Sequence, residues 1–508
     1  MTSGETIVAI ATAAGVGGVG IVRLSGHDAV AIAEAVVGAR LDDRRVCVGW
    51  ATGADGARID QVVAFAMRGP RSFTGEDVAE LHGHGGAVNL RSLLAAVTAR
   101  GARMAEPGEF TRRAVANGKL DVARAEALLD VVHAGSERAW RIAQDNLGGR
   151  LGAAAAALEQ RVHRVLAEVE GRIDFPDDDL GGEDAAWVDA EATAVADACA
   201  RLADGFGHGR AVMSGVSVAL VGPVNVGKSS LLNALVGRER AIVAAAPGTT
   251  RDYLEVSDVW DGVAVTVVDT AGTRDAGAAV DEVERRGIEL GAARVAAADV
   301  VLVVGDGATA RDLGPFGGRA LAVRSKCDLD APDGRAADRS TRAGDRSGES
   351  AGVVDGRSAD LDAGPARAAA TTGGTGSGDT AEVPAGATQS GPRRAGAQGD
   401  APASSEVATS ARTGAGIAEL RRAVLAKAGV AEREGREDAV VTTARQHAQC
   451  VAARDACRAA VTARSTGAVA EIVALELRTA ANALAALRGD EVGERVLDEV
   501  FARFCIGK

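Results

Sequence analysis

The segment Val218-Ala-Leu-Val-Gly222-Pro-Val-Asn-Val-Gly227-Lys228-Ser229-Ser230 decides the fold of the central part of this chain. Its first four residues are apolar and predict a buried strand. The Gly-x-x-x-x-Gly-Lys-Ser pattern that follows is typical of a loop whose backbone N–H groups surround phosphate oxygens, and the loop leads into a helical run at residues 231–235. We therefore predict that Lys228 contacts the β- and γ-phosphates of a nucleotide and that the Ser229 hydroxyl binds Mg²⁺.

Downstream segments supply the other parts of a nucleotide site. Residues 263–268 predict a second strand, which ends in Asp269-Thr-Ala-Gly272, where a carboxylate can hold the water shell of a metal and a glycine N–H can reach a γ-phosphate. The polar segment Pro247-Gly-Thr-Thr-Arg-Asp252 lies between them and predicts a switch loop. Its Thr250 hydroxyl would bind Mg²⁺ only when the γ-phosphate is present.

Two further β-like runs end in Ser325-Lys-Cys-Asp328 and in Ser410-Ala-Arg412. The Asp328 carboxylate can accept two hydrogen bonds from the N1 and N2 edge of guanine, which adenine cannot offer, so the set indicates GTP. The predicted GTP contacts are Asn225, Val226, Gly227, Lys228, Ser229, Ser230, Ala244, Ala245, Ala246, Pro247, Gly248, Thr249, Thr250, Asp269, Thr270, Ala271, Gly272, Ser325, Lys326, Asp328, Ser410, Ala411 and Arg412.

Length and composition set the class of protein. A chain of 508 residues is too long for one core and should hold about three domains. Aromatic residues are scarce, at 3%, so the cores must be built from Ala, Val and Leu. The net charge of -13 argues against a general basic surface for nucleic acid. Any contact with RNA would therefore be local or made through a partner.

The cysteines and the apolar runs predict a cytoplasmic location. The six cysteines form no C-x-x-C pair, which suits a reducing compartment and argues against structural zinc. No apolar run approaches the ~18 residues that a membrane span requires. The N-terminal residues carry no positive charge ahead of their apolar stretch, so we expect neither a signal peptide nor a membrane contact.

Composition along the chain predicts a multidomain α/β and α fold. Residues 1–118 mix short β-like runs with one strong helical stretch and predict a small α+β domain. Residues 119–212 and 431–508 share Ala-, Leu- and Glu-rich helical spacing and predict one discontinuous helical domain. A Ras-like α/β GTPase domain with a mostly parallel sheet, residues 213–430, would be inserted between its halves. Within it, residues 331–405 are too poor in apolar residues to bury a core and predict a disordered insert.

Two histidines and a glutamate stand out in the N-terminal domain. His82 and His84 are separated by one residue with no third ligand nearby, which favours a structural role over a metal site. Glu80 alternates with apolar neighbours on a predicted strand, where it can be a solvated residue or part of a site.

Several motifs stand in collinear order over nearly the whole chain. The N-terminal motifs are Thr6-Ile-Val-Ala-Ile-Ala-Thr12, Gly17-Gly-Val-Gly-Ile-Val-Arg23, Ser72-Phe-Thr-Gly-Glu-Asp77, Pro107-Gly-Glu-Phe-Thr-Arg-Arg-Ala114 and Asn117-Gly-Lys-Leu-Asp121. The chain ends in Arg503-Phe-Cys-Ile-Gly-Lys508. Together these motifs resemble the MnmE (TrmE) family of tRNA-modifying GTPases, and the ending is similar to the C-terminal signature of that family.

The resemblance implies an activity beyond GTP hydrolysis. With a flavin-dependent partner of the MnmG (GidA) type, the family adds a carboxymethylaminomethyl-type group to C5 of the wobble uridine of certain tRNAs. It implies an N-terminal domain that binds a 5-formyl- or methylene-tetrahydrofolate through Arg23, Glu80, Lys119 and Lys508. Glu80 can accept from the amino edge of a pterin, and the cations can meet folate carboxylates.

The resemblance also implies a potassium-dependent hydrolysis, activated when two GTPase domains face each other in a homodimer. Asn225 stands where the family holds K⁺, and Ala244, Ala246 and Thr249 stand at the positions that complete the shell of the ion. The glutamate that positions water in the family matches Glu284. Cys505 is either a thiolate in the modification chemistry or a small apolar residue near the terminus.

The sequence departs from the expected patterns in three places. Threonine occupies position 273, where many GTPases have a glutamine that orients water, so the hydrolytic machinery must differ. Ser325 replaces an asparagine of the guanine motif, which shortens one base contact and a brace to the P-loop. Around Gly15, Ala13, Ala14 and Val16 replace the prolines and the basic residue of the family.

Two other functions remain open from the sequence. A GTP-driven switch in ribosome assembly or regulation would need no modification chemistry, although such proteins usually carry a basic RNA-binding module. A scaffold that hydrolyses GTP poorly and binds only folate and a partner is the second, and Ser325 favours it slightly.

Overall fold

The computed structural model describes residues 4–174, 185–237, 254–269, 291–305, 314–329, 406–430, 439–489 and 494–507. By its contacts the chain divides into two units, Met1–Asp328 with Glu406–Lys508, and Leu329–Ser405. The predicted insert at 331–405 belongs to the second unit and lies outside the described residues. The domain boundaries set out above stay predictions.

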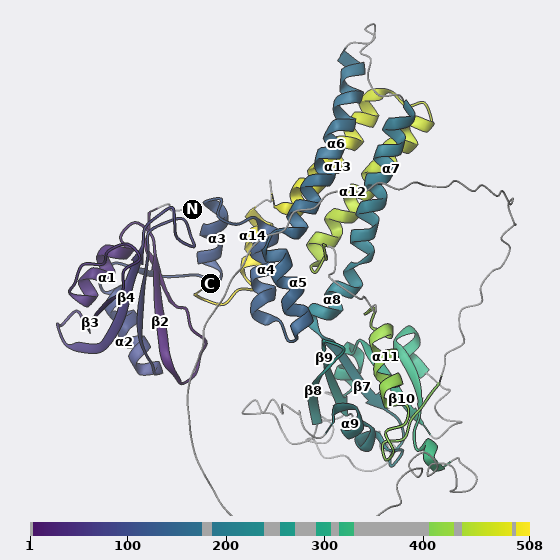
Figure 1. Ribbon diagram of the computed structural model, residues 1–508, viewed down its shortest axis with the longest axis horizontal. Coiled ribbons are helices and arrows are strands. Elements are labelled where there is room, and N and C mark those ends of the chain that lie inside the picture. The colour runs from purple at the N-terminus through teal and green to yellow at the C-terminus, as the bar shows by residue number, and fades with distance from the viewer. Residues whose placement is uncertain are drawn as a thin grey trace, which may run out of the picture. The chain divides into compact units, whose positions relative to one another are not determined.

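The N-terminal part is a six-stranded sheet with α1 and α2 packed on one face, while Phe110 of α3 packs against Ile7 and Ala9 on the other face of β1 (Figure 1). Its strands are β1 Ile7–Ile10, β2 Gly17–Ser25, β3 Cys47–Thr52, β4 Arg58–Met67, β5 Val78–Gly85 and β6 Arg103–Met104, in the order β3-β4-β5-β2-β1-β6. All pairs are antiparallel except β1 with β6. The helices are α1 Ala29–Val37, α2 Ala87–Thr98 and α3 Glu109–Ala116.

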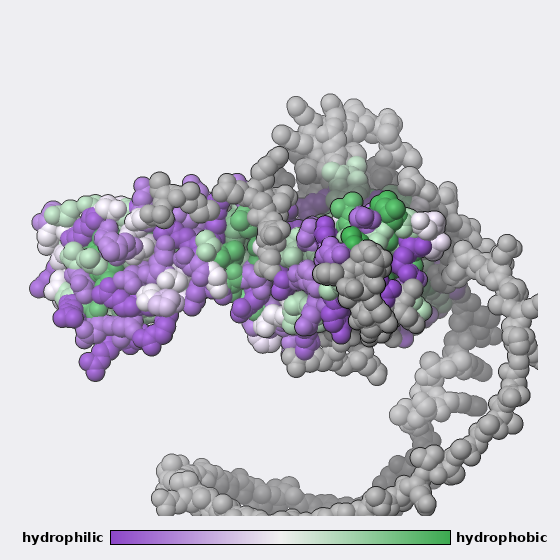
Figure 2. Space-filling model, turned by 90° about the horizontal axis from the view of Figure 1, so that it is seen from above, coloured by the Kyte–Doolittle hydropathy of each residue, from purple (hydrophilic) through white to green (hydrophobic). Residues whose placement is uncertain are grey.

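Strand β4 shows why its part of the sheet has one covered face. Val62, Ala64 and Ala66 are buried in the core that includes residues of α1 and α2, whereas Gln61 and Val63 between them are exposed. This alternation is the pattern of an antiparallel strand with one face in the core. Figure 2 shows that hydrophilic residues cover most of the face that this part, at the left, turns toward the viewer.

Helices from both sides of the GTPase segment pack into one bundle. The first set is α4 Val122–His133, α5 Glu137–Leu147, α6 Arg150–Asp174, α7 Ala185–Asp204 and α8 Phe206–Ser214. The second is α12 Ala444–Ser465, α13 Ala470–Arg488 and α14 Glu494–Phe501. Leu, Val, Ala and Cys side chains of α6, α7, α12 and α13 share one core, as the scarcity of aromatic residues predicts. Figure 1 shows these four helices side by side.

A buried ion pair ties the two halves of the bundle together. The Arg445 guanidinium of α12 lies 2.8 Å from the Glu126 carboxylate of α4, which is only 6% exposed. The Gln446 amide donates a further hydrogen bond of 2.7 Å to Glu126, and its side chain also completes a capping box with Thr443. Removing one partner would leave a buried charge unpaired, which typically costs about 3–5 kcal/mol.

The GTPase segment forms a second six-stranded sheet in the order β12-β11-β10-β7-β9-β8. The strands are β7 Val216–Val221, β8 Leu254–Trp260, β9 Val263–Asp269, β10 Val300–Gly305, β11 Ala320–Arg324 and β12 Val407–Ala408. Helices α9 Lys228–Val236 and α11 Ile417–Lys427 and the short 3-10 helices η2 Gly314–Arg319 and η3 Cys327–Leu329 complete it. Only β8 is antiparallel, so the carboxyl ends of the other strands meet at one edge.

None of the helices in the described residues has both the length and the apolar content that crossing a membrane requires.

Asp130 of α4 gives this bundle a predictable dependence on pH. Burial is the largest influence and raises the pKa of its carboxyl to about 6, against a hydrogen bond from Thr442 that lowers it. Because the folded state holds the proton more tightly than the unfolded state, stability falls as pH rises from about 4 to about 6. We expect Asp130→Asn to raise the free energy of unfolding by about 2 kcal/mol at pH 7 and to gain nothing at pH 4.

Thermal unfolding of the two proteins across pH 4–8 measures this difference. The control is Asp197→Asn, because Asp197 is an exposed carboxylate of the same bundle. An Asp130→Asn protein no more stable than the parent at pH 7 would contradict the argument.

Candidate functional site

Glycine allows the loop after β7 to adopt its backbone conformation. Gly222 has φ 148°, and a Cβ there would collide with the carbonyl oxygen of Val304 at the end of β10. Gly227 has φ 107°, and Asn225 adopts the left-handed region at φ 63°. Asparagine is one of the few side chains that tolerate this region. The two glycines of the motif therefore allow a tight turn directly against the neighbouring strand.

Lys228 is the first residue of α9 and is only 8% exposed. Its Nζ donates hydrogen bonds to two carbonyl oxygens of its own loop, at 3.0 Å to Gly222 and 2.9 Å to Pro223. The ammonium group thus lies within the loop, where a phosphate chain would take the place of these uncharged partners. The contact of Lys228 with the β- and γ-phosphates stays a prediction.

Ser325 and Lys326, which follow β11, donate hydrogen bonds to main-chain oxygens of the loop after β7. The Ser325 hydroxyl is 2.6 Å from the Val226 carbonyl oxygen and 3.2 Å from that of Gly305. Lys326 donates from Nζ to the Asn225 carbonyl oxygen at 3.0 Å. The sequence predicted that serine shortens the brace to the P-loop, but the structure keeps the brace through a direct hydrogen bond. A hydroxyl has one hydrogen to donate, and here it faces these two carbonyls.

Ser229 and Asp269 meet at the edge where β9 ends. The Ser229 hydroxyl donates to Asp269 Oδ2 at 2.6 Å. Asp269 Oδ1 is buried and has no hydrogen-bond partner among the residues that the structure describes. A buried carboxylate oxygen without a partner is costly unless something else satisfies it. The hydroxyl and carboxylate oxygens are ligands that Mg²⁺ prefers, so these two residues fit a magnesium site.

Asp328 of η3 is held by two side chains of the loop after β12. The Ser410 hydroxyl donates to Oδ1 at 2.8 Å, and Arg412 Nε lies 3.0 Å from Oδ2. The hydrogen bond from Ser410 is the main cause that lowers the pKa of this carboxyl, and Arg412 adds to it. Asp328 is therefore ionised and oriented as an acceptor, as recognition of guanine requires.

Several predicted site residues lie outside the described residues. They are Ala244, Ala245, Ala246, Pro247, Gly248, Thr249 and Thr250 of the switch segment, Thr270, Ala271 and Gly272 after β9, Glu284, and the terminal Lys508. Their roles stay predictions.

The predicted folate residues divide into two places in the N-terminal part. Arg23 of β2 and Glu80 of β5 are cross-strand partners, with Arg23 Nε 2.8 Å from Glu80 Oε1. Glu80 is only 7% exposed, so it is not a solvated residue. Lys119 lies elsewhere, and its Nζ donates to the Pro70 carbonyl oxygen at 2.9 Å in the loop between β4 and β5. Cys505 is exposed.

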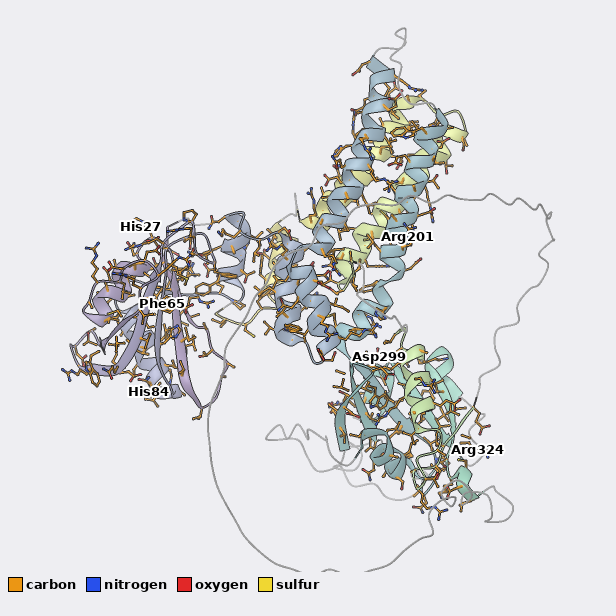
Figure 3. The ribbon with its side chains drawn as sticks, in the orientation of Figure 1. His27, Phe65, His84, Arg201, Asp299 and Arg324 are labelled. Atoms are coloured by element: carbon orange, nitrogen blue, oxygen red, sulfur yellow. The ribbon has the colours of Figure 1, made fainter. Side chains whose placement is uncertain are left out.

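Sequence reasoning missed the role of His82. Its Nε2 lies 2.8 Å from Glu80 Oε2, and its ring packs edge-on against Phe65 with 5.3 Å between centroids. Phe65 is labelled on the sheet in Figure 3. Residues 80 and 82 are two apart on one strand and therefore share a face, which was the available signal. Both oxygens of the buried Glu80 carboxylate are thus bound, one by Arg23 and one by His82.

Ser325 provides a test of the braced loop. We expect Ser325→Ala to weaken GTP and GDP binding by roughly fivefold, because the Val226 carbonyl of the P-loop loses its hydroxyl partner. Titration with a fluorescent guanine nucleotide measures the affinity. Ser257→Ala is the matched control, since Ser257 is an exposed serine of β8. Equal affinities of the Ser325→Ala and parent proteins would show that the brace is dispensable.

Comparisons with known proteins cover nearly the whole chain. The family profile of the GTP-binding protein TrmE N-terminus matches residues 6–119, and the profile of the MnmE helical domain matches residues 122–505. The chain is 38% identical to the tRNA modification GTPase MnmE of Symbiobacterium thermophilum over 521 residues, which covers 99% of each chain. It is 37% identical to the MnmE of Synechococcus sp. (strain CC9605), with 100% of each chain covered. The chain therefore belongs to the MnmE (TrmE) family of tRNA modification GTPases.

Proposed function

We propose that this protein binds and hydrolyses GTP with Mg²⁺ and K⁺ and modifies C5 of the wobble uridine of certain tRNAs. The observation that carries the proposal is the braced P-loop beside Asp269 and Asp328, within a chain that matches tRNA modification GTPases over its full length. The group added is of the carboxymethylaminomethyl type, and the partner is a flavoprotein of the MnmG (GidA) type. The six free cysteines support a cytoplasmic location for this activity.

Each described nucleotide residue has a distinct task in the proposed reaction. Lys228 exchanges its two carbonyl partners for β- and γ-phosphate oxygens, which gives an ammonium a better partner than a neutral carbonyl. Ser229 and Asp269 hold Mg²⁺, with Thr250 as the further predicted ligand. Asp328 accepts the guanine edge while Ser410 keeps its carboxylate in place. When bound, Mg²⁺ neutralises charge on the phosphates.

The hydrolytic step needs residues other than the usual glutamine, since position 273 is threonine. We assign the orientation of water to Glu284. Potassium, when bound near Asn225, supplies the positive charge that an arginine finger provides in other GTPases. The left-handed backbone of Asn225, fixed by the Lys326 ammonium on its carbonyl oxygen, supports a dedicated role for this asparagine.

The N-terminal domain would bind a 5-formyl- or methylene-tetrahydrofolate, which supplies one carbon unit when bound. Glu80 is suited to the amino edge of a pterin because it is buried and its two oxygens are held in place by Arg23 and His82. Lys119 and Lys508 would meet the folate carboxylates, and Cys505 remains a candidate for the modification chemistry.

A homodimer is the proposed assembly. The uncovered face of β3 and β4 exposes Val48 and Val63, which are cross-strand partners, and Trp50 beside them. Apolar groups gathered on an open sheet face favour contact with another protein surface. A second copy of the chain would cover this face.

Potassium dependence tests the hydrolytic part of the proposal. We expect steady-state GTP turnover to be roughly tenfold or more faster in KCl than in NaCl. Asn225→Gly should abolish the difference, because glycine keeps the left-handed backbone but removes the side chain. Asn233→Ala, an exposed asparagine of α9, is the control. Equal slow rates in both salts for the parent protein would refute potassium activation.

Nucleoside analysis tests the modification itself. In a strain that lacks this gene, mass spectrometry of tRNA should show loss of the C5-modified wobble uridines. The parent gene should restore them and Lys228→Ala should not. Unchanged wobble uridines together with a defect in ribosomal subunits would instead favour the assembly switch.

A further inference from the structure

A group of cations surrounds the loop that leads into the strand of Glu80. Arg68 and Arg71 belong to this loop between β4 and β5, Arg44 reaches it from the segment after α1, and Lys119 reaches it from the segment after α3. We call these four residues the arginine rim. All four are exposed, and Arg71 has 76% of its side chain accessible.

The arginine rim carries more positive charge than its contacts neutralise. Arg68 pairs with Asp77 at 2.6 Å, and Arg71 pairs with Asp43 at 3.2 Å. Within the described residues, the hydrogen bonds of the other two cations go to main-chain oxygens, from Arg44 to Arg71 and from Lys119 to Pro70. A carbonyl oxygen accepts a hydrogen bond from a cationic donor but does not neutralise the positive charge of that donor. Two carboxylates therefore face four cations.

The position of the arginine rim links it to the proposed folate site. Val78 begins β5 directly after the loop, and Glu80 follows two residues later, opposite Arg23. Lys119 belongs to both groups, because it is a proposed partner of the folate carboxylates and its Nζ rests on Pro70 of the loop. The rim thus includes Lys119, the proposed partner of the folate carboxylates, and lies on the loop that leads into the strand of Glu80.

We infer that the arginine rim binds the γ-linked polyglutamate tail that cellular folates carry. Each added glutamate brings one more carboxylate, and the tail begins at the glutamate that Lys119 would meet. Arginine donates to carboxylates in a planar fork, so exposed arginines beside Lys119 match such a chain better than isolated point charges would. The inference rests on the proposed folate function and adds a preference for the form of the folate.

A phosphate backbone of RNA is the other polyanion that such a patch can attract. A tail anchored at Lys119 fits the observations better, because the surplus charge is confined to one loop beside the proposed ligand site. The chain as a whole carries a net charge of -13, which opposes wider binding of a polyanion along its surface.

The test compares two forms of one folate on the full-length protein. Equilibrium dialysis with 5-formyl-tetrahydrofolate should show the pentaglutamate binding roughly fivefold to tenfold more tightly than the monoglutamate. The preference should shrink as salt rises, because exposed charges are screened. The double variant Arg44→Gln and Arg71→Gln should bind the pentaglutamate no better than the monoglutamate, and its affinity for the monoglutamate should stay within about twofold of the parent.

Arg91→Gln is the matched control, because Arg91 is an exposed arginine of α2 in the same part of the chain. Unchanged thermal unfolding of each variant verifies folding. Equal affinity of the parent protein for both forms, or a preference that survives the double variant, would overturn the inference and leave the folate proposal intact. A double variant that loses affinity for tRNA and keeps the preference would assign the rim to RNA. Binding of neither form would overturn the folate proposal together with this inference.

Discussion

The shape of the P-loop depends on hydrogen bonds made by its carbonyl oxygens. Lys228 binds those of Gly222 and Pro223, Lys326 binds that of Asn225, and Ser325 binds that of Val226. In a trans peptide the N–H and the C=O point in opposite directions. Because these carbonyls point toward the side chains of Lys228, Ser325 and Lys326, the N–H groups of the same peptides point away from those side chains. The same contacts connect the loop after β7 to the segment that carries Asp328.

A similar principle operates in the other two parts of the molecule, where a buried carboxylate is held by several partners. Glu126 joins the two halves of the helical bundle because Arg445 and Gln446 both bind it. Glu80 lies on a strand between Arg23 and His82. Burial of a charge is costly unless the charge is paired and hydrogen-bonded, so each of these carboxylates fixes the positions of its neighbours. In the bundle this constraint joins segments more than 300 residues apart in the sequence.

Local patterns were enough to predict many elements of the fold. The apolar run before the Gly-x-x-x-x-Gly-Lys-Ser loop became β7, and the run after it became α9. Helical spacing on both sides of the GTPase segment predicted that the flanks form one bundle. Strand β3 and helix α1 were not predicted, because Gly, Ala and charged residues interrupt the alternation that identifies a half-buried strand or an amphipathic helix.

By itself, the sequence determined that the Gly-x-x-x-x-Gly-Lys-Ser loop joins a strand to a helix and that Asp269 ends a strand, because each of these depends on a contiguous motif with local spacing. The phosphate, metal and guanine roles of Lys228, Asp269 and Asp328 stay predictions. Only the tertiary structure decided that Ser325 still braces the loop and that His82 binds Glu80. It also placed Arg44, which precedes the loop between β4 and β5 in the sequence, and Lys119, which follows it, against that loop. These contacts join residues brought together by strand pairing and chain reversal, and their partners are mostly backbone carbonyls, which every residue has and no sequence motif distinguishes.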